Sequence, residues 1–237
     1  MDMLRHMGWS GKSGTQLQTS LLWNNIYKKS SGDYEWGCTP DQFLAYDYRS
    51  NGFSMYASVN DTLPADCSVL MIGAGASLLG EALYDQGYQP VVQTDFSEVI
   101  VERRKETTSR DAYPNMNWEC VDARFPLTSL LKYVHDASCP GVDKQHFGAV
   151  VDKGLIDGLY LAGGSSMDDI GKVVSNVAEV LAPERGVFVT LSYSAPSIIS
   201  PLLKNKYFSS VEARMMESAD IYLYRMSRGD MQWNNDT

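Results

Sequence analysis

The chain has 237 residues, of which 44% are hydrophobic, enough for one ordinary globular domain with its own core. No run of about 18 apolar residues occurs, so we expect no membrane-spanning helix, and residues 1–19 lack the apolar segment of a signal peptide. Twenty basic and twenty-nine acidic residues give a formal net charge of -9. This charge argues against a dedicated nucleic-acid binder. It would attract a basic protein partner, and the alternative is that the acidity only keeps the protein soluble.

Cysteine spacing and the two ends of the chain set further expectations. The four cysteines form no C-x-x-C pair and have no histidine at ligand spacing, so we expect neither structural zinc nor a disulfide framework. A reducing cytoplasm suits this pattern. We expect residues 1–19 to be a mobile tail, residues 20–228 to form one domain that is a monomer or a weak dimer, and residues 229–237 to be a second tail.

From Ser68 onward, short apolar runs alternate with amphipathic stretches, which is typical of a parallel α/β sheet. Ser68 to Ile72 predicts a buried strand, and Leu78 to Gln86 predicts a helix that Gly87 ends. A second strand is predicted over Pro90 to Thr94. Ser97 is the expected N-cap of a helix that reaches to about Arg110.

The second half of the chain continues the alternation and then changes. Strands are predicted over Met116–Val121, Phe147–Asp152 and Gly186–Ser192, with a surface loop at Ala137–Gln145. Ser166, with Asp169 as its capping partner, begins a helix that ends near Pro183. Tyr207–Met215 and Ile221–Met226 are separated by a short link, which suits a hairpin. The expected fold is a Rossmann-like α/β fold with a seven-stranded, mostly parallel sheet, a C-terminal antiparallel hairpin and helices on both faces.

A glycine turn follows the first strand directly. In Gly73-Ala74-Gly75, the glycines allow a ligand to approach the backbone closely, and the following helix offers free N–H groups. A dinucleotide site prefers G-x-G-x-x-G, whereas Leu78 stands at the third glycine position. This difference argues against a nicotinamide oxidoreductase and favours a nucleoside ligand without a pyrophosphate.

Carboxylates follow the next three strands. Asp95, 20 residues after Gly75, can accept both ribose hydroxyl hydrogens, although it could instead only cap the next helix. Asp122 can accept from an adenine amino group while the N–H of Ala123 reaches a ring nitrogen; the alternative is a solvated loop aspartate. Asp152 would face the reacting end of the ligand, or merely cap its loop, and Asp157 is interpreted as structural.

Several motifs together resemble a known family. The stretches IGAGASLLGEALYDQGY, TDFSEVIV, MNWECVDAR and FGAVVDKGLIDGL are similar to the lysine methyltransferases that modify translation elongation factor 1-alpha, and to their relatives. WNNIY at Trp23–Tyr27, YEW at Tyr34–Trp36, SYSAP at Ser192–Pro196 and IYLY at Ile221–Tyr224 extend the resemblance over residues 20–228. The resemblance implies a class I, seven-stranded methyltransferase that uses S-adenosyl-L-methionine and acts on a protein.

The resemblance also implies which residues contact the cofactor. They are Trp23, Tyr27, Trp36, Gly73, Ala74, Gly75, Asp95, Phe96, Asp122, Ala123 and Lys153. Aromatic faces near a sulfonium give cation–π stabilisation and exclude water. The residues alone support the glycines and the aspartates, whereas core packing would explain Trp23, Tyr27 and Trp36 equally well.

The proposed reaction requires little of the protein beyond alignment. The sulfonium already activates the methyl group, and the lysine amine must arrive neutral. A carboxylate would raise the pKa of that amine, so we expect Asp152 to be a positioning group and not a strong base. His6, His135 and His146 lie outside the motifs and receive no catalytic role.

The sequence departs from the family pattern at three places, which leaves the substrate open. Gly37 to Pro40 replace an acidic and aromatic pair, Ser138 to Lys144 enlarge a loop, and Leu155 stands where many protein-lysine methyltransferases carry an aromatic residue. One alternative is therefore a small-molecule N- or O-methyltransferase. A second is a non-catalytic methyltransferase-like binding protein.

Overall fold

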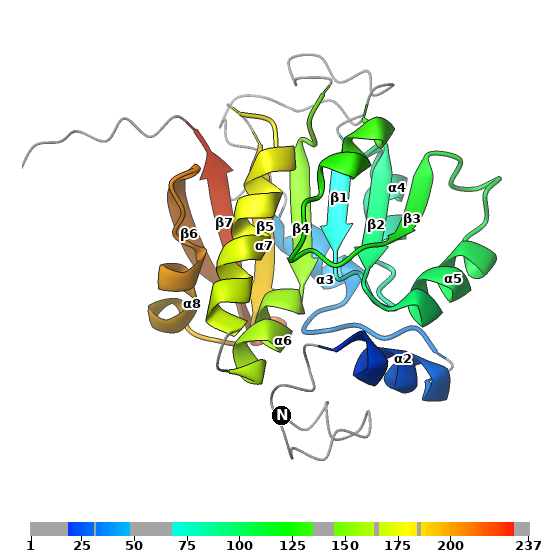
Figure 1. The fold of residues 1–237 in the computed structure, drawn as a ribbon, viewed down its shortest axis with the longest axis horizontal. Helices are drawn as coiled ribbons and strands as arrows, with labels where there is room; N and C mark the ends of the chain where they lie inside the picture. The colour runs from blue at the N-terminus through cyan, green and yellow to red at the C-terminus, as the bar shows by residue number, and fades with distance from the viewer. Residues whose placement is uncertain are drawn as a thin grey trace, which may run out of the picture.

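One twisted sheet forms the centre of the protein (Figure 1). The computed structural model describes residues 19–30, 32–47, 68–134, 145–163, 166–183 and 186–229. Within these residues the sheet has seven strands in the order β3-β2-β1-β4-β5-β7-β6. The strands are β1 (Val69–Ile72), β2 (Val91–Asp95), β3 (Met116–Cys120), β4 (Ala149–Lys153), β5 (Val187–Ser192), β6 (Phe208–Met216) and β7 (Ile221–Arg228).

The pairing of the strands confirms the predicted fold class. The first five strands are parallel to one another, whereas β7 runs antiparallel to both β5 and β6. Every residue of β1, β2, β4 and β5 is buried, because helices cover both faces of the sheet. The continuous apolar runs that predicted buried strands therefore lie at the centre, and their bounds match the expected ranges to within about two residues.

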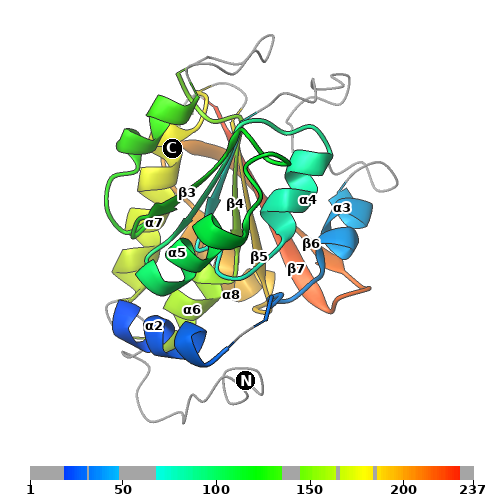
Figure 2. The same ribbon diagram turned by 90° about the vertical axis from the view of Figure 1, so that its right-hand side faces the viewer.

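Helices form a layer on each face of the sheet (Figure 2). The first layer contains α3 (Pro40–Asp47), α4 (Leu79–Asp85) and α5 (Glu98–Thr107), and the second contains the short 3-10 helix η2 (Thr128–Tyr133), α6 (Leu155–Ala162), α7 (Ser166–Val180) and α8 (Pro196–Leu203). The remaining helix, α2 (Ser20–Lys29), lies across the carboxyl ends of the parallel strands and packs on α5. It brings residues from before the sheet to the edge where ligands of such folds bind.

Four of these elements were not predicted from the sequence: α2, α3, η2 and α8. In α8, Pro196 stands at the first helical position, where proline is well tolerated, but Pro201 in the interior disfavours an ordinary helix. Burial of Ile199 and Leu203 against the sheet offsets that cost. In α2, Arg103 of α5 donates hydrogen bonds to the carbonyls of Tyr27 and Ser30, which satisfies acceptors at the end of the helix.

The two predicted helix caps have different outcomes. Ser97 is the N-cap residue of α5, as expected, but its hydroxyl donates to Oδ1 of Asn24 at 2.5 Å and makes no capping bond, and the helix ends at Thr107. The Asp169 carboxylate accepts from Lys172 at 2.7 Å and from Arg124 at 3.4 Å. The side chain of Ser166, with which Asp169 was expected to cap α7, lies outside the described residues. At Ser97, a side chain from another element replaces the local bond that the sequence suggested.

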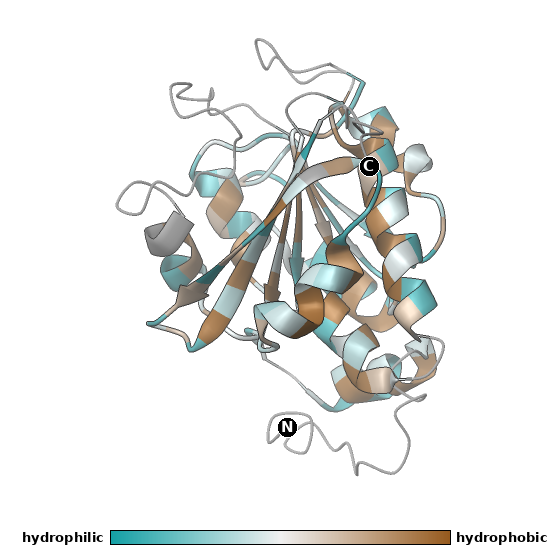
Figure 3. Cartoon of the chain, turned by 90° about the vertical axis from the view of Figure 1, so that its left-hand side faces the viewer, coloured by the Kyte–Doolittle hydropathy of each residue, from teal (hydrophilic) through white to brown (hydrophobic). Residues whose placement is uncertain are grey.

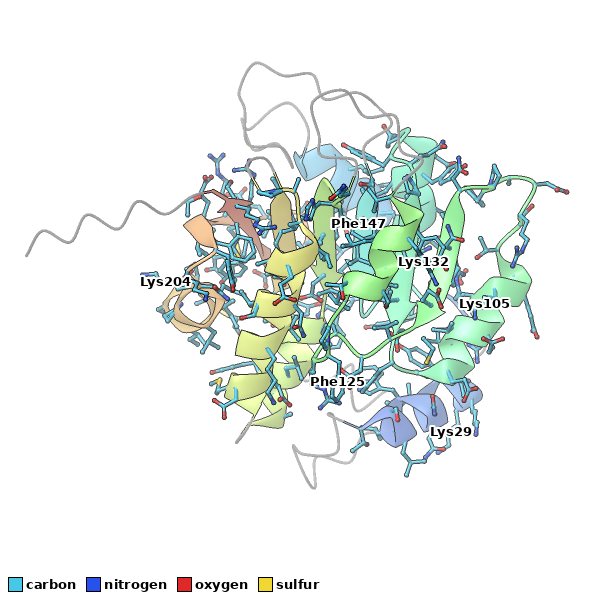
Figure 4. All side chains as sticks on the ribbon, turned by 45° about the horizontal axis from the view of Figure 1, so that its top comes forward. Lys29, Lys105, Phe125, Lys132, Phe147 and Lys204 are labelled. Atoms are coloured by element: carbon cyan, nitrogen blue, oxygen red, sulfur yellow. The ribbon has the colours of Figure 1, made fainter. Side chains whose placement is uncertain are left out.

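Apolar and polar residues are segregated as the fold requires. Helices in Figure 3 carry both brown and teal bands, as amphipathic helices do. Figure 4 shows Lys29, Lys105 and Lys204 at the edge of the molecule, whereas Phe147 is fully buried. No helix in the described parts of the chain is long and apolar enough to cross a membrane. The tails predicted at residues 1–19 and 229–237 lie almost wholly outside the described residues, as does the loop predicted at 137–145.

Truncating a fully buried ring on the central strands should weaken the fold strongly. Phe188 of β5 has no exposed surface, and its ring centre lies 6.3 Å from that of Phe208. Phe188→Ala is expected to lower the free energy of unfolding by about 3–5 kcal/mol, because it removes apolar contacts and leaves a cavity. Urea denaturation measures the change. Met215→Ala, on the exposed face of β6, should cost less than about 1 kcal/mol.

Candidate functional site

A cavity opens at the carboxyl ends of β1, β2, β3 and β4. It encloses about 910 Å3 when the space open to solvent at its mouth is included. The structure brings all eleven residues expected to contact the cofactor to its wall: Trp23, Tyr27, Trp36, Gly73, Ala74, Gly75, Asp95, Phe96, Asp122, Ala123 and Lys153. They come from six separate stretches of the chain, so the sheet topology assembles the wall.

The glycine turn forms the floor of the cavity. Gly73 and Gly75 have φ angles of +60° and +55°, a left-handed backbone that disfavours other residues. A Cβ on Gly73 would lie 2.9 Å from Cβ of Leu155, and one on Gly75 would lie 2.7 Å from the hydroxyl oxygen of Tyr27. The two glycines are therefore required both by the backbone conformation and by the side chains packed over the turn.

Asp95 closes the end of β2 and is oriented by the backbone around it. One carboxylate oxygen accepts from the N–H of Gly75 at 3.0 Å, and the other accepts from the N–H of Ser97 at 2.8 Å. Burial raises the pKa of Asp95 to about 6, although these hydrogen bonds lower it. The carboxylate faces the cavity in a defined orientation and still has lone pairs for a ligand.

Asp122, after β3, is held by a neighbouring cation. Nε of Arg124 lies 2.9 Å and 3.0 Å from the two carboxylate oxygens, and Nη2 lies 2.6 Å from one of them. Nη1 of the same guanidinium reaches Asp169 of α7 at 3.4 Å. Arg124 also lines the cavity, so it fixes the Asp122 carboxylate beside the ligand space.

Glu35 ties the segment after α2 to the sheet. It accepts from the Ser77 hydroxyl at 2.7 Å and from the N–H of Leu78 at 2.8 Å, and it forms an ion pair with Lys153. The Lys153 side chain is 2% exposed, and its ammonium also donates to the carbonyl of Cys38 at 2.8 Å. A charge buried so deeply requires such partners, so this cluster fixes where the segment crosses the cavity.

Four aromatic rings line the cavity beside this segment: Trp23, Tyr27, Tyr34 and Trp36. The centres of Trp23 and Tyr27 lie 5.9 Å apart on α2. Trp36 lies over Gly154, where a Cβ would come within 2.7 Å of its ring. Nε1 of Trp36 donates to Asp157 at 3.3 Å. Asp157 therefore has the structural role that the sequence suggested, with Trp36 as one of its partners.

Asp152 is the one predicted site residue that the structure places elsewhere. We expected it to face the reacting end of the ligand, but it is absent from the described residues that line the cavity. Its carboxylate is fully buried below α6, where it accepts from the N–H groups of Leu155 at 2.7 Å and Ile156 at 3.2 Å and from the Thr190 hydroxyl at 2.6 Å. The orphan N–H groups of the first turn of α6 turn it away from the cavity.

Among the residues of the site that sequence reasoning missed are Tyr34 and Arg124 in the cavity wall, and Glu35 behind it. Tyr34 and Glu35 belong to the YEW stretch that carried part of the resemblance, yet only Trp36 was assigned from it. Arg124 follows Asp122 by two residues, so its ion pair was detectable as a local Asp-x-Arg pattern. Glu35 gives no such local signal, because its partners lie 42 to 118 residues away.

Comparisons with known proteins agree with this geometry. The chain is 29% identical over 138 residues to the eEF1A lysine and N-terminal methyltransferase of Xenopus laevis, covering 58% of this chain and 18% of that protein. It is 33% identical over 114 residues to the Homo sapiens protein of the same name, covering 48% and 13%. Methyltransferase srdJ of Neurospora crassa is 27% identical over 147 residues, covering 62% and 58%. No family model matches the chain.

Structural similarity supports the same class. A chain of the solved complex between the Haloferax volcanii Trm112 methyltransferase activator and a putative methyltransferase superposes with a TM-score of 0.51 at 10% identity, covering 72% of this chain and 86% of that one. The fold is thus that of the class I, seven-stranded methyltransferases. Within that class, the sequence resemblance to the eEF1A lysine methyltransferases is confirmed. The chain spans less than a fifth of the length of the first two relatives named above.

Breaking the ion pair between Glu35 and Lys153 should destabilise the protein more than removing both charged groups. Glu35→Leu leaves the buried Lys153 ammonium without its carboxylate, and we expect it to cost about 3 kcal/mol in the free energy of unfolding. Adding Lys153→Met should recover most of that loss, since a buried pair can be replaced by apolar side chains. Urea unfolding of the wild type, both single variants and the double variant measures the coupling. A double variant no more stable than Glu35→Leu would assign the loss to the Ser77 and Leu78 bonds instead.

Proposed function

We propose that this chain is an S-adenosyl-L-methionine-dependent methyltransferase that methylates lysine in a basic protein substrate, such as translation elongation factor 1-alpha. The observation that carries the proposal is the convergence of the Gly73–Gly75 turn, Asp95 and Asp122 on one cavity with aromatic walls. The names of the two eEF1A lysine and N-terminal methyltransferases support protein lysine as the substrate. We also propose the cytoplasm as the location of the protein.

The cavity has the features that this cofactor needs. Asp95 and Asp122 would accept hydrogen bonds from the ribose hydroxyls and the adenine amino group, and the Gly73–Gly75 turn leaves room for the amino-acid part. Aromatic side chains such as Trp36 and Tyr34 offer faces that suit a positively charged sulfonium. The third glycine of a dinucleotide turn is replaced by Leu78, which argues against a ligand with a pyrophosphate.

The protein's contribution to the reaction is alignment and the exclusion of water. When bound, S-adenosyl-L-methionine would supply a methyl group activated by its sulfonium; the new bond would form between the amine nitrogen and the methyl carbon as the carbon–sulfur bond breaks, with S-adenosyl-L-homocysteine as the leaving group. The rings of Trp23, Tyr27, Tyr34 and Trp36 keep water from the centre of the cavity and restrict the direction of approach. Asp152 is buried below α6, so the carboxylate that the sequence placed near the reacting amine does not hold the proton of that amine. The proton then leaves to solvent.

Binding of the product S-adenosyl-L-homocysteine should depend on the ionised Asp95 carboxylate. Asp95→Asn is expected to weaken its affinity about 10- to 100-fold, because charge-assisted hydrogen bonds to the ribose are lost. For the wild type, affinity should be constant above the pKa of about 6 and fall as the pH drops below it. The sign follows because binding selects the ionised form, so protons compete, with a limit of about tenfold per pH unit. Isothermal titration calorimetry measures both effects.

The Asp95→Asn variant is its own control for the pH effect. Its weaker affinity should not change between about pH 5 and 8, because the amide does not titrate. An unchanged thermal unfolding transition would show that the variant is folded. Absence of product binding by the wild type at any pH would overturn the cofactor assignment and favour a binding protein that has kept only the fold.

Methyl transfer tests the substrate assignment separately. Purified chain, tritiated S-adenosyl-L-methionine and purified elongation factor 1-alpha should give label on lysine, located by mass spectrometry of peptides. Gly75→Ala should reduce the rate by at least about tenfold, because its Cβ would meet the Tyr27 hydroxyl oxygen and its backbone is left-handed. If label appeared on small amines or acids and on no protein, the proposed protein substrate would be wrong and the substrate would be a small molecule.

A further inference from the structure

The sheet order leaves a separate region for a methyl acceptor. Gly75, Asp95 and Asp122 occupy the ends of β1, β2 and β3, on one side of the cavity. On the other side lie the ends of β4 and β5 and the beginning of β7, since Ser192 of β5 pairs with Tyr222 of β7. The link between β6 and β7, residues 217–220, therefore lies at the same edge of the sheet. The side of the cavity at the ends of β4 and β5 and the beginning of β7 is therefore available to the methyl acceptor.

Tyr193 is the exposed aromatic residue of that side. It follows β5 directly, is 52% exposed, and does not belong to the cavity wall. Its ring centre lies 6.1 Å from that of Trp36 with the planes at 62°, an edge-to-face pair. Trp36 lines the cavity and Tyr193 does not, so the pair extends the aromatic surface from the inside of the cavity to the solvent.

A single buried carboxylate holds both members of this pair. Asp157 of α6 accepts from Nε1 of Trp36 at 3.3 Å and from the backbone N–H of Tyr193 at 3.0 Å, and also from the Ser192 hydroxyl. It is 3% exposed. Tyr193 is therefore fixed at its backbone although about half of the residue is exposed to solvent.

We propose that Tyr193, together with Trp36 and Tyr34, forms a subsite that receives the cationic side chain of a substrate lysine at the entrance of the cavity. This inference rests on the proposed function and names the residues that select its substrate. A lysine ammonium over an aromatic face gains attraction that a neutral side chain lacks, and its apolar stem packs on the rings. Tyr34 and Trp36 both line the cavity, and Tyr193 lies outside its wall.

Electrostatics near Tyr193 favour a cation. Burial raises the pKa of the Tyr193 hydroxyl, and the negative charges of Asp157 and of the exposed Asp220 of the β6–β7 link raise it further. Burial is also the largest cause of the raised pKa of Tyr34. Both rings therefore remain neutral phenols, which offer aromatic faces and hydroxyl acceptors to an ammonium group.

Peptide binding to the complex with S-adenosyl-L-homocysteine tests this subsite without turnover. The probes are a fluorescein-labelled basic decapeptide with one central lysine and its twin with norleucine at that position. Wild type should bind the lysine peptide about five- to tenfold more tightly than the norleucine peptide, as measured by fluorescence anisotropy. Tyr193→Ala should reduce this preference to less than about twofold, whereas Tyr193→Phe should retain it because the ring is kept.

The controls separate this inference from the proposed function. Product affinity should be the same in wild type and Tyr193→Ala, because Tyr193 is not part of the cavity wall. Phe125→Ala removes another exposed ring, 64% exposed and beyond β3, and should leave the lysine preference unchanged. The subsite alone would be overturned if the lysine preference survived Tyr193→Ala. It would also be overturned if wild type bound the product but showed no lysine preference. Loss of product binding by the wild type would overturn the cofactor assignment.

Discussion

The buried ion pair between Glu35 and Lys153 is the constraint on which the site depends. It joins residues that lie 118 positions apart, one before the first strand and one at the end of β4. Glu35 also accepts from Ser77 and Leu78 beside the glycine turn, so one carboxylate fixes the entry segment, the turn and β4 relative to one another. Because the ammonium is 2% exposed, any arrangement that separates the pair carries a large desolvation cost. The ion pair thereby also fixes Tyr34 and Trp36, the chain neighbours of Glu35, in the aromatic wall of the cavity.

The buried carboxylates near the carboxyl edge of the sheet are of two kinds, those used within the protein and one that lines the cavity. Asp152 and Asp157 are used within the protein, below α6 and against β5, where N–H and hydroxyl donors orient them. Asp95 is oriented by backbone N–H groups as well, but it lines the cavity. Burial raises the pKa of Asp95 to about 6, so its charge is stable at neutral pH but responsive to mild acid. A ligand with hydroxyl donors offsets part of the cost of burying that charge.

The mixed sheet places the proposed cofactor region and the proposed acceptor region at one edge. Parallel strands β1, β2 and β3 end beneath the glycine turn and the two ligand-facing aspartates. The antiparallel β7 reverses direction, which brings the β6–β7 link to the same edge beside Tyr193. A nucleoside cofactor and a protein side chain can therefore approach from neighbouring directions and meet near Trp36. This arrangement is consistent with a transferase whose two substrates bind together.

The sequence by itself determined the strands, the class of fold and the residues of the glycine turn and of the β2 and β3 ends. These follow from local signals: apolar runs of strand length, glycines that must be left-handed, and carboxylates directly after strands. Only the tertiary structure decided that Asp152 turns under α6, that Glu35 reaches Lys153, and that Tyr193 lies beside Trp36. Each of these depends on which distant donors and rings the folded chain brings within reach. Helices α2 and α8 formed for the same reason, because burial and long-range hydrogen bonds outweighed weak local propensity.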